Sequence, residues 1–319
     1  QLVGLINSRK MLFRPEGINL LTWENDLQNE GEIARLGEFI EDIQMHNLPN
    51  AVFVDSTANK DIIQYYYPLL QASVSIVTPN KVANSGPYAQ YLSLQQTARK
   101  GNAKFLYETN VGAGLPIINT LQGLITSGDK IHRIEAVLSG TLSYIFNTFE
   151  VGKKFVDVVK EAKEKGYTEP DPREDLSGMD VARKILILAR EAGFSIEPSD
   201  IEVVPLLNEA CVKAPDVPSF YTALEADNAR FEQLIQAAQA EEKVLRFVAT
   251  LEDGKAKVSL KTVGKEHPFF GLTGSENIVS FTTERYKFNP LVIKGPGAGA
   301  EVTAMGVFAD IMSISSFLQ

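Results

Sequence analysis

The stretch 166–184 holds the densest group of side chains in this sequence that could carry out chemistry. Two prolines stiffen a loop that bears four carboxylates, those of Glu169, Asp171, Glu174 and Asp175. A helix is predicted to follow, with Ser177 as its N-cap. On that helix Asp180 and Lys184 are four residues apart, so their side chains share one face. The ordinary interpretation of such a pair is a surface ion pair worth about 0.3–0.5 kcal/mol.

The stiffness of the loop favours a more specific use of these groups. Carboxylates held beside a lysine can bind the ammonium group of an amino acid while the lysine transfers a proton. We therefore predict that 166–184 forms a substrate site, with Lys184 as the group that moves a proton.

The elements that must position this site begin with a repeating pattern of strand and helix. Apolar runs predict strands at 2–6, 51–54, 74–77 and 104–107. Helical spacing of apolar residues predicts helices within 31–46, 59–71 and 85–100. This alternation indicates an α/β fold with a Rossmann-like parallel sheet. Such sheets bind ligands beyond the carboxyl ends of their strands.

Small polar residues follow the predicted strands, and this edge is where we expect a cofactor. The candidates are Asn7, Ser8, Arg9, Lys10, Ser56, Thr57 and Lys81. If 2–6 is the second strand of a dinucleotide-binding unit, the cations at its end suit the 2′-phosphate of NADP. The alternative is that Arg9 and Lys10 are simply solvated. On this interpretation the first strand and its glycine-rich loop are missing from the sequence.

The rest of the chain predicts a second, α+β domain for substrate binding and dimerisation. We expect helices at 116–127, 155–165 and 178–192, and strands at 131–138, 244–251, 256–263 and 277–283. A last strand at 291–294 leads into a closing helix. The predicted division is 1–115 plus 291–319 for the dinucleotide-binding domain and 116–290 for the second domain.

The glycine-rich segment 295–300 lies between that last strand and the closing helix. Its sequence GPGAGA fits the spacing of a dinucleotide fingerprint. Too few residues follow it for a second strand with a ribose-binding acid. We interpret it as a loop whose glycines let the backbone approach a ligand or a neighbouring helix, with Gly295 and Gly297 as cofactor contacts. A plain strand-to-helix turn is the alternative.

Composition excludes several classes of function. The net charge is −9 and no basic cluster stands out, which argues against a nucleic-acid partner. The apolar runs are too short to span a membrane. Cys211 is the only cysteine, so a disulfide within the chain is excluded and a reducing compartment, the cytoplasm, is expected. The three histidines are scattered, so we expect no zinc site.

Several long motifs together resemble one enzyme family. They are 166–184, Thr78-Pro79-Asn80-Lys81, the stretch 108–116, the stretch 140–145 and the glycine-rich segment. Taken in their order along the chain, they resemble homoserine dehydrogenases, and most of all the dehydrogenase half of bifunctional aspartokinase–homoserine dehydrogenases. The likeness covers nearly the whole chain. The sequence departs from the family pattern at its N-terminal end, since neither the glycine fingerprint nor a kinase domain is present.

The resemblance implies reversible reduction of L-aspartate 4-semialdehyde to L-homoserine with NADP(H), or with NAD(H), in threonine and methionine biosynthesis. It places substrate binding on Glu169 and Asp175, proton transfer on Lys184 with Asp180 beside it, and contact with cofactor and substrate on Lys81. It also implies a monovalent cation, Na⁺ or K⁺, at the Glu108 carboxylate and the carbonyls of Val111, Ala113 and Leu115. A homodimer or larger homo-oligomer fused to an aspartokinase domain is expected.

Two other functions stay open on the sequence. An acylating enzyme like aspartate-semialdehyde dehydrogenase needs an activated cysteine nucleophile. Cys211 has no histidine near it in sequence and resembles a packed core thiol. The second alternative is a truncated dimerisation and regulatory domain that cannot hold cofactor.

Overall fold

The computed structural model describes residues 1–316, and its internal contacts divide it into two compact units. Unit 1 contains Gln1–Val82, Leu92–Leu106 and the end of the chain from Ile311. Unit 2 contains Ala83–Tyr91 and Tyr107–Asp310. The predicted domain division stays a prediction, and the contacts divide the chain differently from it.

Unit 1 holds the predicted parallel sheet. Its strands are β4 (Val52–Val54), β5 (Ser75–Val77) and β6 (Phe105–Leu106), in that order and all parallel. Helix α3 (Ile63–Gln71) packs on β5, and α2 (Leu36–His46) packs on α3. Most of α5 (Tyr88–Lys100) belongs to the same unit. The alternation of strand and helix read from the sequence is confirmed here.

The first strand of the chain pairs in a way that the sequence did not predict. β1 (Gly4–Ile6) is antiparallel to β2 (Lys10–Phe13), which pairs with β3 (Glu32–Ile33) in a separate sheet. The reason is the turn between β1 and β2. Asn7 Oδ1 accepts the backbone N–H groups of Arg9 and Lys10, each at 2.8 Å, and the Asn7 N–H donates to the Lys10 carbonyl. An asparagine used in this way closes a tight turn and reverses the chain. Helix α1 (Trp23–Glu30) packs on β2.

Unit 2 is built on a six-stranded sheet with the order β12-β11-β7-β9-β10-β8. Its strands are β7 (Ile131–Val137), β8 (Glu202–Val203), β9 (Val244–Glu252), β10 (Lys255–Val263), β11 (Glu276–Thr283) and β12 (Leu291–Pro296). β9 and β10 form a hairpin whose turn contains Asp253 and Gly254, both with positive φ. The predicted second, α+β domain is confirmed.

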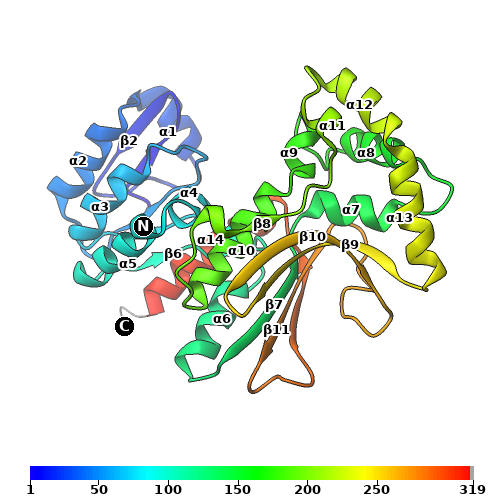
Figure 1. Cartoon of the computed structure of the whole chain (residues 1–319). Coiled ribbons are helices and arrows are strands. Elements are labelled where there is room, and N and C mark those ends of the chain that lie inside the picture. The colour runs from blue at the N-terminus through cyan, green and yellow to red at the C-terminus, as the bar shows by residue number, and fades with distance from the viewer. Residues whose placement is uncertain (317–319) are drawn as a thin grey trace. The chain divides into compact units, whose positions relative to one another are not determined.

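Helices cover one face of this sheet (Figure 1). α7 (Gly140–Thr148) packs on β9 and β11, and α10 (Met179–Glu191) packs on β9 and β10. The rings of Phe155 and Phe231 stack at 3.7 Å and join α8 to α13. The other α-helices that lie wholly in unit 2 are α6 (Ile117–Thr126), α8 (Phe155–Glu164), α9 (Pro172–Leu176), α11 (Glu209–Val212), α12 (Val217–Ala226) and α13 (Asn228–Ala240).

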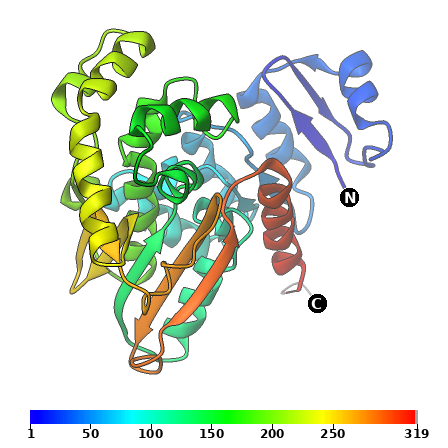
Figure 2. The same ribbon diagram turned by 90° about the vertical axis from the view of Figure 1, so that its right-hand side faces the viewer.

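The last strand belongs to this sheet. β12 is the edge strand beside β11, and the chain runs from it through the glycine-rich segment into α14 (Ala300–Ser316), as Figure 2 shows. The domain prediction had assigned 291–319 to the dinucleotide-binding part, whereas β12 pairs with residues of unit 2. Among residues 1–316, no helix has both the length and the apolar character needed to cross a membrane.

Candidate active site

Lys184 and Asp180 form the pair that helical spacing predicts. Both lie on α10, and Lys184 Nζ is 2.7 Å from Asp180 Oδ2. Lys184 Nζ also donates a 2.7 Å hydrogen bond to the carbonyl of Leu138, where β7 ends. The lysine side chain is only 11% exposed, whereas that of Asp180 is 48% exposed. The ammonium group is therefore held between the Asp180 carboxylate and the Leu138 carbonyl.

The start of α10 differs from the prediction. Gly178, with φ of 73°, is the N-cap, and the predicted cap Ser177 ends α9 instead. The Ser177 hydroxyl still accepts the Met179 N–H at 3.2 Å. A Cβ at Gly178 would lie 2.8 Å from the Phe247 ring, so the close packing of α10 on the sheet requires glycine here.

A hydrogen-bonded brace connects α7 to the segment 166–177 that bears the four carboxylates, here called the acidic loop. Thr141 Oγ1 lies 2.5 Å from the Tyr167 carbonyl oxygen and 3.0 Å from Asp175 Oδ1, so its single hydroxyl proton is shared between these two acceptors. The second oxygen of Asp175 accepts the backbone N–H of Glu169 at 2.9 Å. Thr141 and Asp175 therefore hold the backbone of the loop at Tyr167 and at Glu169. The part 172–176, predicted as loop, is the short helix α9, which Asp171 caps.

Burial changes the pKa of the Asp175 carboxyl group in this brace. Desolvation raises the pKa of Asp175, the negative charge of Asp180 raises it further, and the bonds from Glu169 and Thr141 oppose the rise. Glu169 itself is exposed, so its carboxylate is accessible to a ligand. Unit 2 therefore brings together four predicted site residues: Glu169, Asp175, Asp180 and Lys184.

A second buried carboxylate lies in the turn η1 (Glu108–Asn110) that the resemblance connects with a monovalent cation. The Glu108 oxygens accept the N–H groups of Ile118 at 2.6 Å and Asn119 at 2.8 Å, at the start of α6. The Glu108 N–H donates to Asp310 Oδ2 at 3.0 Å. Burial raises the pKa of Glu108 to about 7 and that of Asp310 to about 6.

This turn has the chemistry of a site for a hard cation. Thr109 Oγ1 is buried and has no hydrogen-bond partner within residues 1–316. Ala113 follows Gly112 in the left-handed region, with φ of 52° and 77°, so the carbonyls change direction sharply there. The Leu115 carbonyl also accepts the Ile117 N–H at 2.8 Å. Buried carboxylate, hydroxyl and carbonyl oxygens are the donors that hard cations prefer.

The predicted cofactor residues of unit 1 fall into two groups. In the first, the Asn7 side chain closes the β1–β2 turn and is therefore used by the fold. Lys10 Nζ donates to the backbone carbonyls of Gln28 and Gly31. Ser8 and Arg9 are exposed at the turn, so of the two cations Arg9 is the one available to an anionic ligand.

The second group lies at the carboxyl ends of β4 and β5. Ser56 and Thr57 are exposed on the loop after β4, where the Thr57 N–H donates to Asp55 Oδ1 at 2.8 Å. Lys81 lies on the loop after β5. These positions agree with the edge at which a parallel sheet binds its ligands.

The glycine-rich segment packs closely against the protein itself. A Cβ at Gly297 would lie 1.9 Å from Asn277 Cγ, and one at Gly295 would lie 2.9 Å from the Leu115 side chain. The absence of a Cβ at these glycines lets the backbone approach Asn277 and Leu115 closely, as one of the two interpretations of this loop expects. Asn277 Oδ1 is buried and lacks a partner among residues 1–316. The cofactor role of Gly295 and Gly297 stays a prediction.

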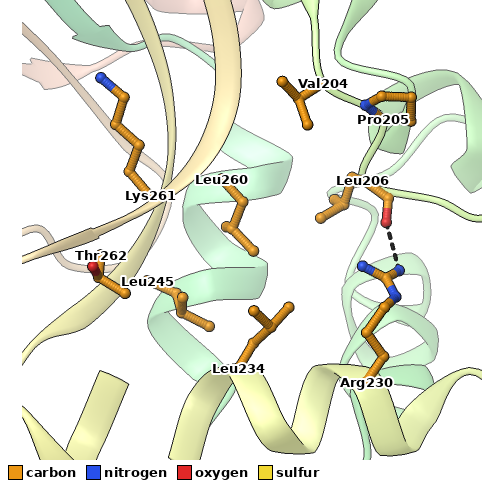
Figure 3. A pocket seen from close by; sticks show the side chains of 9 residues that line it. All are labelled: Val204, Pro205, Leu206, Arg230, Leu234, Leu245, Leu260, Lys261 and Thr262. Carbon is orange, nitrogen blue, oxygen red and sulfur yellow. Dashed lines mark hydrogen bonds between the residues drawn. The ribbon is translucent and has the colours of Figure 1, made fainter. Parts of the chain in front are cut away.

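The cavity of unit 2 that Figure 3 shows lies apart from the predicted residues. Its volume is about 530 Å³, and Leu234, Leu245 and Leu260 line it. The one arginine in its wall, Arg230, donates to the carbonyl of Leu206 at 2.7 Å. None of the predicted site residues lines this cavity.

Cys211 does not have the properties of a nucleophile. It is buried, and burial raises the pKa of its thiol. An acylating enzyme needs a thiolate that is exposed to substrate. Within residues 1–316, no cluster of three or more His, Cys, Asp or Glu side chains is placed to hold a metal ion.

Comparison with known proteins identifies the family. Residues 116–312 match the family described as homoserine dehydrogenase, and residues 1–108 match its NAD binding domain. The chain belongs to the homoserine dehydrogenase family. A bifunctional aspartokinase/homoserine dehydrogenase from Zea mays is 48% identical over the whole chain, which spans 35% of that relative. The homoserine dehydrogenase of Schizosaccharomyces pombe is 44% identical over 94% of the chain and 81% of its own length.

A solved structure agrees with this fold. A Candida auris protein, described as being of unknown function, superposes with a TM-score of 0.91 at 39% identity, covering 97% of this chain and 88% of its own. The family matches and the curated relatives confirm the resemblance read from the motifs. The chain spans about a third of the length of the bifunctional relatives, so the activity of a whole protein does not follow from the match alone.

Proposed function

We propose that this chain interconverts L-homoserine and L-aspartate 4-semialdehyde with a nicotinamide cofactor. The observation that carries the proposal is the position of Lys184, whose buried ammonium group is held between Asp180 and the Leu138 carbonyl beside the acidic loop. A group held in this way can take or give a proton at a fixed point.

The roles of the residues follow from their contacts. As the neutral amine, Lys184 accepts the hydroxyl proton when homoserine is oxidised, and as the ammonium group it returns that proton to the alkoxide in the reverse direction. Asp180 orients the lysine through their 2.7 Å ion pair. The exposed carboxylate of Glu169 binds the substrate ammonium group. Asp175 uses both oxygens on Thr141 and the Glu169 N–H, so its contribution to binding is to hold the loop.

The cofactor, when bound, supplies the acceptor or donor of the hydride. For this chain we propose that Ser56, Thr57 and Lys81 contact it at the carboxyl edge of β4 and β5. The cofactor contacts of Gly295 and Gly297 stay predictions from the sequence. The exposed cation of Arg9 favours NADP(H) over NAD(H), because a guanidinium group binds a 2′-phosphate through charge-assisted hydrogen bonds. The family match to an NAD binding domain supports a nicotinamide cofactor.

We further propose that Na⁺ or K⁺ binds at Glu108 and the carbonyls of Val111, Ala113 and Leu115. The support is the buried Glu108 carboxylate with Asp310 beside it. A cation would stabilise the ionised form of Glu108, whose pKa burial raises to about 7. Its role is structural, since it would fix the turn before α6.

The assembly is proposed from the relatives. The bifunctional relatives support fusion to an aspartokinase. A homodimer or larger homo-oligomer stays a prediction. The cytoplasmic location stays a prediction, and the maize relative carries the description chloroplastic.

Titration of the complete protein with NADPH tests the proposal against the cofactor-incompetent scaffold. Saturable binding of NADPH, followed by its oxidation when L-aspartate 4-semialdehyde is added, is the expected result. A folded protein that binds no NADPH would instead support the scaffold.

A further inference from the structure

A buried carboxylate at the end of β4 organises the loops of the proposed cofactor edge. Asp55 is 1% exposed. Its Oδ2 accepts the Tyr66 hydroxyl at 2.5 Å and the Asn80 amide Nδ2 at 3.1 Å, and its Oδ1 accepts the Thr57 N–H at 2.8 Å. One side chain thus ties together α3, the loop after β4 and the loop after β5.

The loop after β5 is held through Asn80. Asn80 Nδ2 also donates to the Asn59 carbonyl at 2.9 Å. Its Oδ1 accepts the Val82 N–H at 3.1 Å, which closes a turn with Lys81 as the central residue. The direction in which Lys81 leaves the backbone therefore depends on the conformation of the Asn80 side chain, and that conformation depends on Asp55.

Tyr66 holds the Asp55 carboxylate from the buried core of unit 1. Its ring is fully buried and meets the Phe105 ring edge-on at 5.6 Å. Burial and the neighbouring Asp55 raise the pKa of its hydroxyl, so the hydroxyl stays a donor. A donor with a fixed ring holds the Asp55 carboxylate in one rotamer, with Oδ2 available to Asn80.

We propose that Asp55 and Tyr66 are positioning residues for the reaction: through Asn80 they set the turn that presents Lys81, and through Thr57 they set the loop after β4. The inference rests on the proposed function, which assigns cofactor contact to Lys81 and Thr57. Neither Asp55 nor Tyr66 touches the ligands in this account, and both act through the backbone of the two loops.

The test compares two tyrosines that each donate to a carboxylate. Tyr66→Phe removes the hydroxyl and keeps the buried ring. The matched control is Tyr91→Phe, because the Tyr91 hydroxyl donates to Glu191 Oε1 at 2.9 Å and is likewise largely buried, but has no part in these loops. Both variants are made in the complete protein, and their melting temperatures, NADPH affinities, and kcat and KM for homoserine are measured.

Tyr66→Phe is expected to lower kcat by about tenfold to hundredfold, because a cofactor whose contacts with Lys81 and Thr57 have shifted reacts from a misplaced position. Its NADPH dissociation constant should rise about fivefold, the equivalent of one ordinary hydrogen bond. Tyr91→Phe should lose similar thermal stability, with kcat and NADPH affinity within about twofold of wild type. Equal effects of the two variants on kcat and NADPH affinity would overturn the proposal, since the hydroxyl would then serve the fold alone.

If Tyr66→Phe does not fold, the pair Asp55→Asn and Glu191→Gln decides the question by the same comparison. A failure of the proposed function can be distinguished from a failure of the positioning role. A wild-type protein that binds NADPH but does not oxidise homoserine contradicts the reaction, whereas the effect of Tyr66→Phe on NADPH affinity still decides the positioning role.

Discussion

Replacing Lys184 by methionine removes the one charged group that the proposed reaction cannot do without. Methionine keeps an unbranched apolar stem, which suits a side chain that is only 11% exposed. The variant loses the hydrogen bond to the Leu138 carbonyl and the ion pair with Asp180. Its effects on turnover and on stability can therefore be worked out separately.

The effect on turnover is the larger of the two. A positioned proton-transfer group contributes about 10²–10⁴-fold to the rate, equivalent to about 2.7–5.4 kcal/mol of activation free energy. The cost in stability is smaller. A buried acceptor that loses its donor costs about 1–3 kcal/mol, while Asp180 is 48% exposed and regains water. The protein should therefore stay folded while turnover collapses.

The assay is kcat for NADP⁺-dependent oxidation of homoserine, with thermal unfolding and NADP⁺ affinity measured on the same samples. Arg183→Met is the matched control, because Arg183 is the exposed neighbouring cation on α10. The control should behave like wild type. A folded Lys184→Met protein whose kcat stays within about tenfold of wild type would refute the assignment of proton transfer to this lysine.

Three further predictions follow from the same geometry. Glu169→Gln should raise the homoserine KM and leave NADP⁺ affinity unchanged, because a neutral amide no longer pairs with the substrate ammonium group; a KM within about twofold of wild type would remove Glu169 from the site. In the complete protein, Arg9→Ala should weaken NADPH by about 1.5–3 kcal/mol and NADH hardly at all, and equal losses measured by titration would show a solvated cation. Replacing Na⁺ and K⁺ by choline should lower the melting temperature of wild type but not of Glu108→Gln, and equal shifts in both would argue against the cation site.

The sequence predicted those elements whose apolar or helical pattern lies within a few neighbouring residues. The apolar runs 51–54, 74–77 and 104–107 are β4, β5 and β6, and the helical spacing of Asp180 and Lys184 gave their ion pair. The pairing of β1 with β2 was missed because it depends on one asparagine side chain in the turn. The place of β12 was missed because its partner β11 is chosen by the packing of the whole sheet.

The sequence offered the charged residues of the candidate site, whose roles stay predictions, but it did not indicate the residues that hold them in place. Thr141 bonds to Asp175 across 34 positions, and Lys184 bonds to Leu138 across 46. Periodicity carries no information over such separations, because the direction of each side chain is set by tertiary packing. Asp55 and Asp310 were missed for a similar reason, since a lone carboxylate in sequence gives no sign that it will be buried.

The most direct test of the central claim is the stoichiometry of the reaction in the complete protein. Homoserine and NADP⁺ are incubated with it, and the NADPH and aspartate 4-semialdehyde formed are both quantified. The account predicts equal amounts of the two products, with neither appearing in Lys184→Met. NADP⁺ binding without NADPH formation from homoserine, or NADPH formation without the aldehyde, would contradict it.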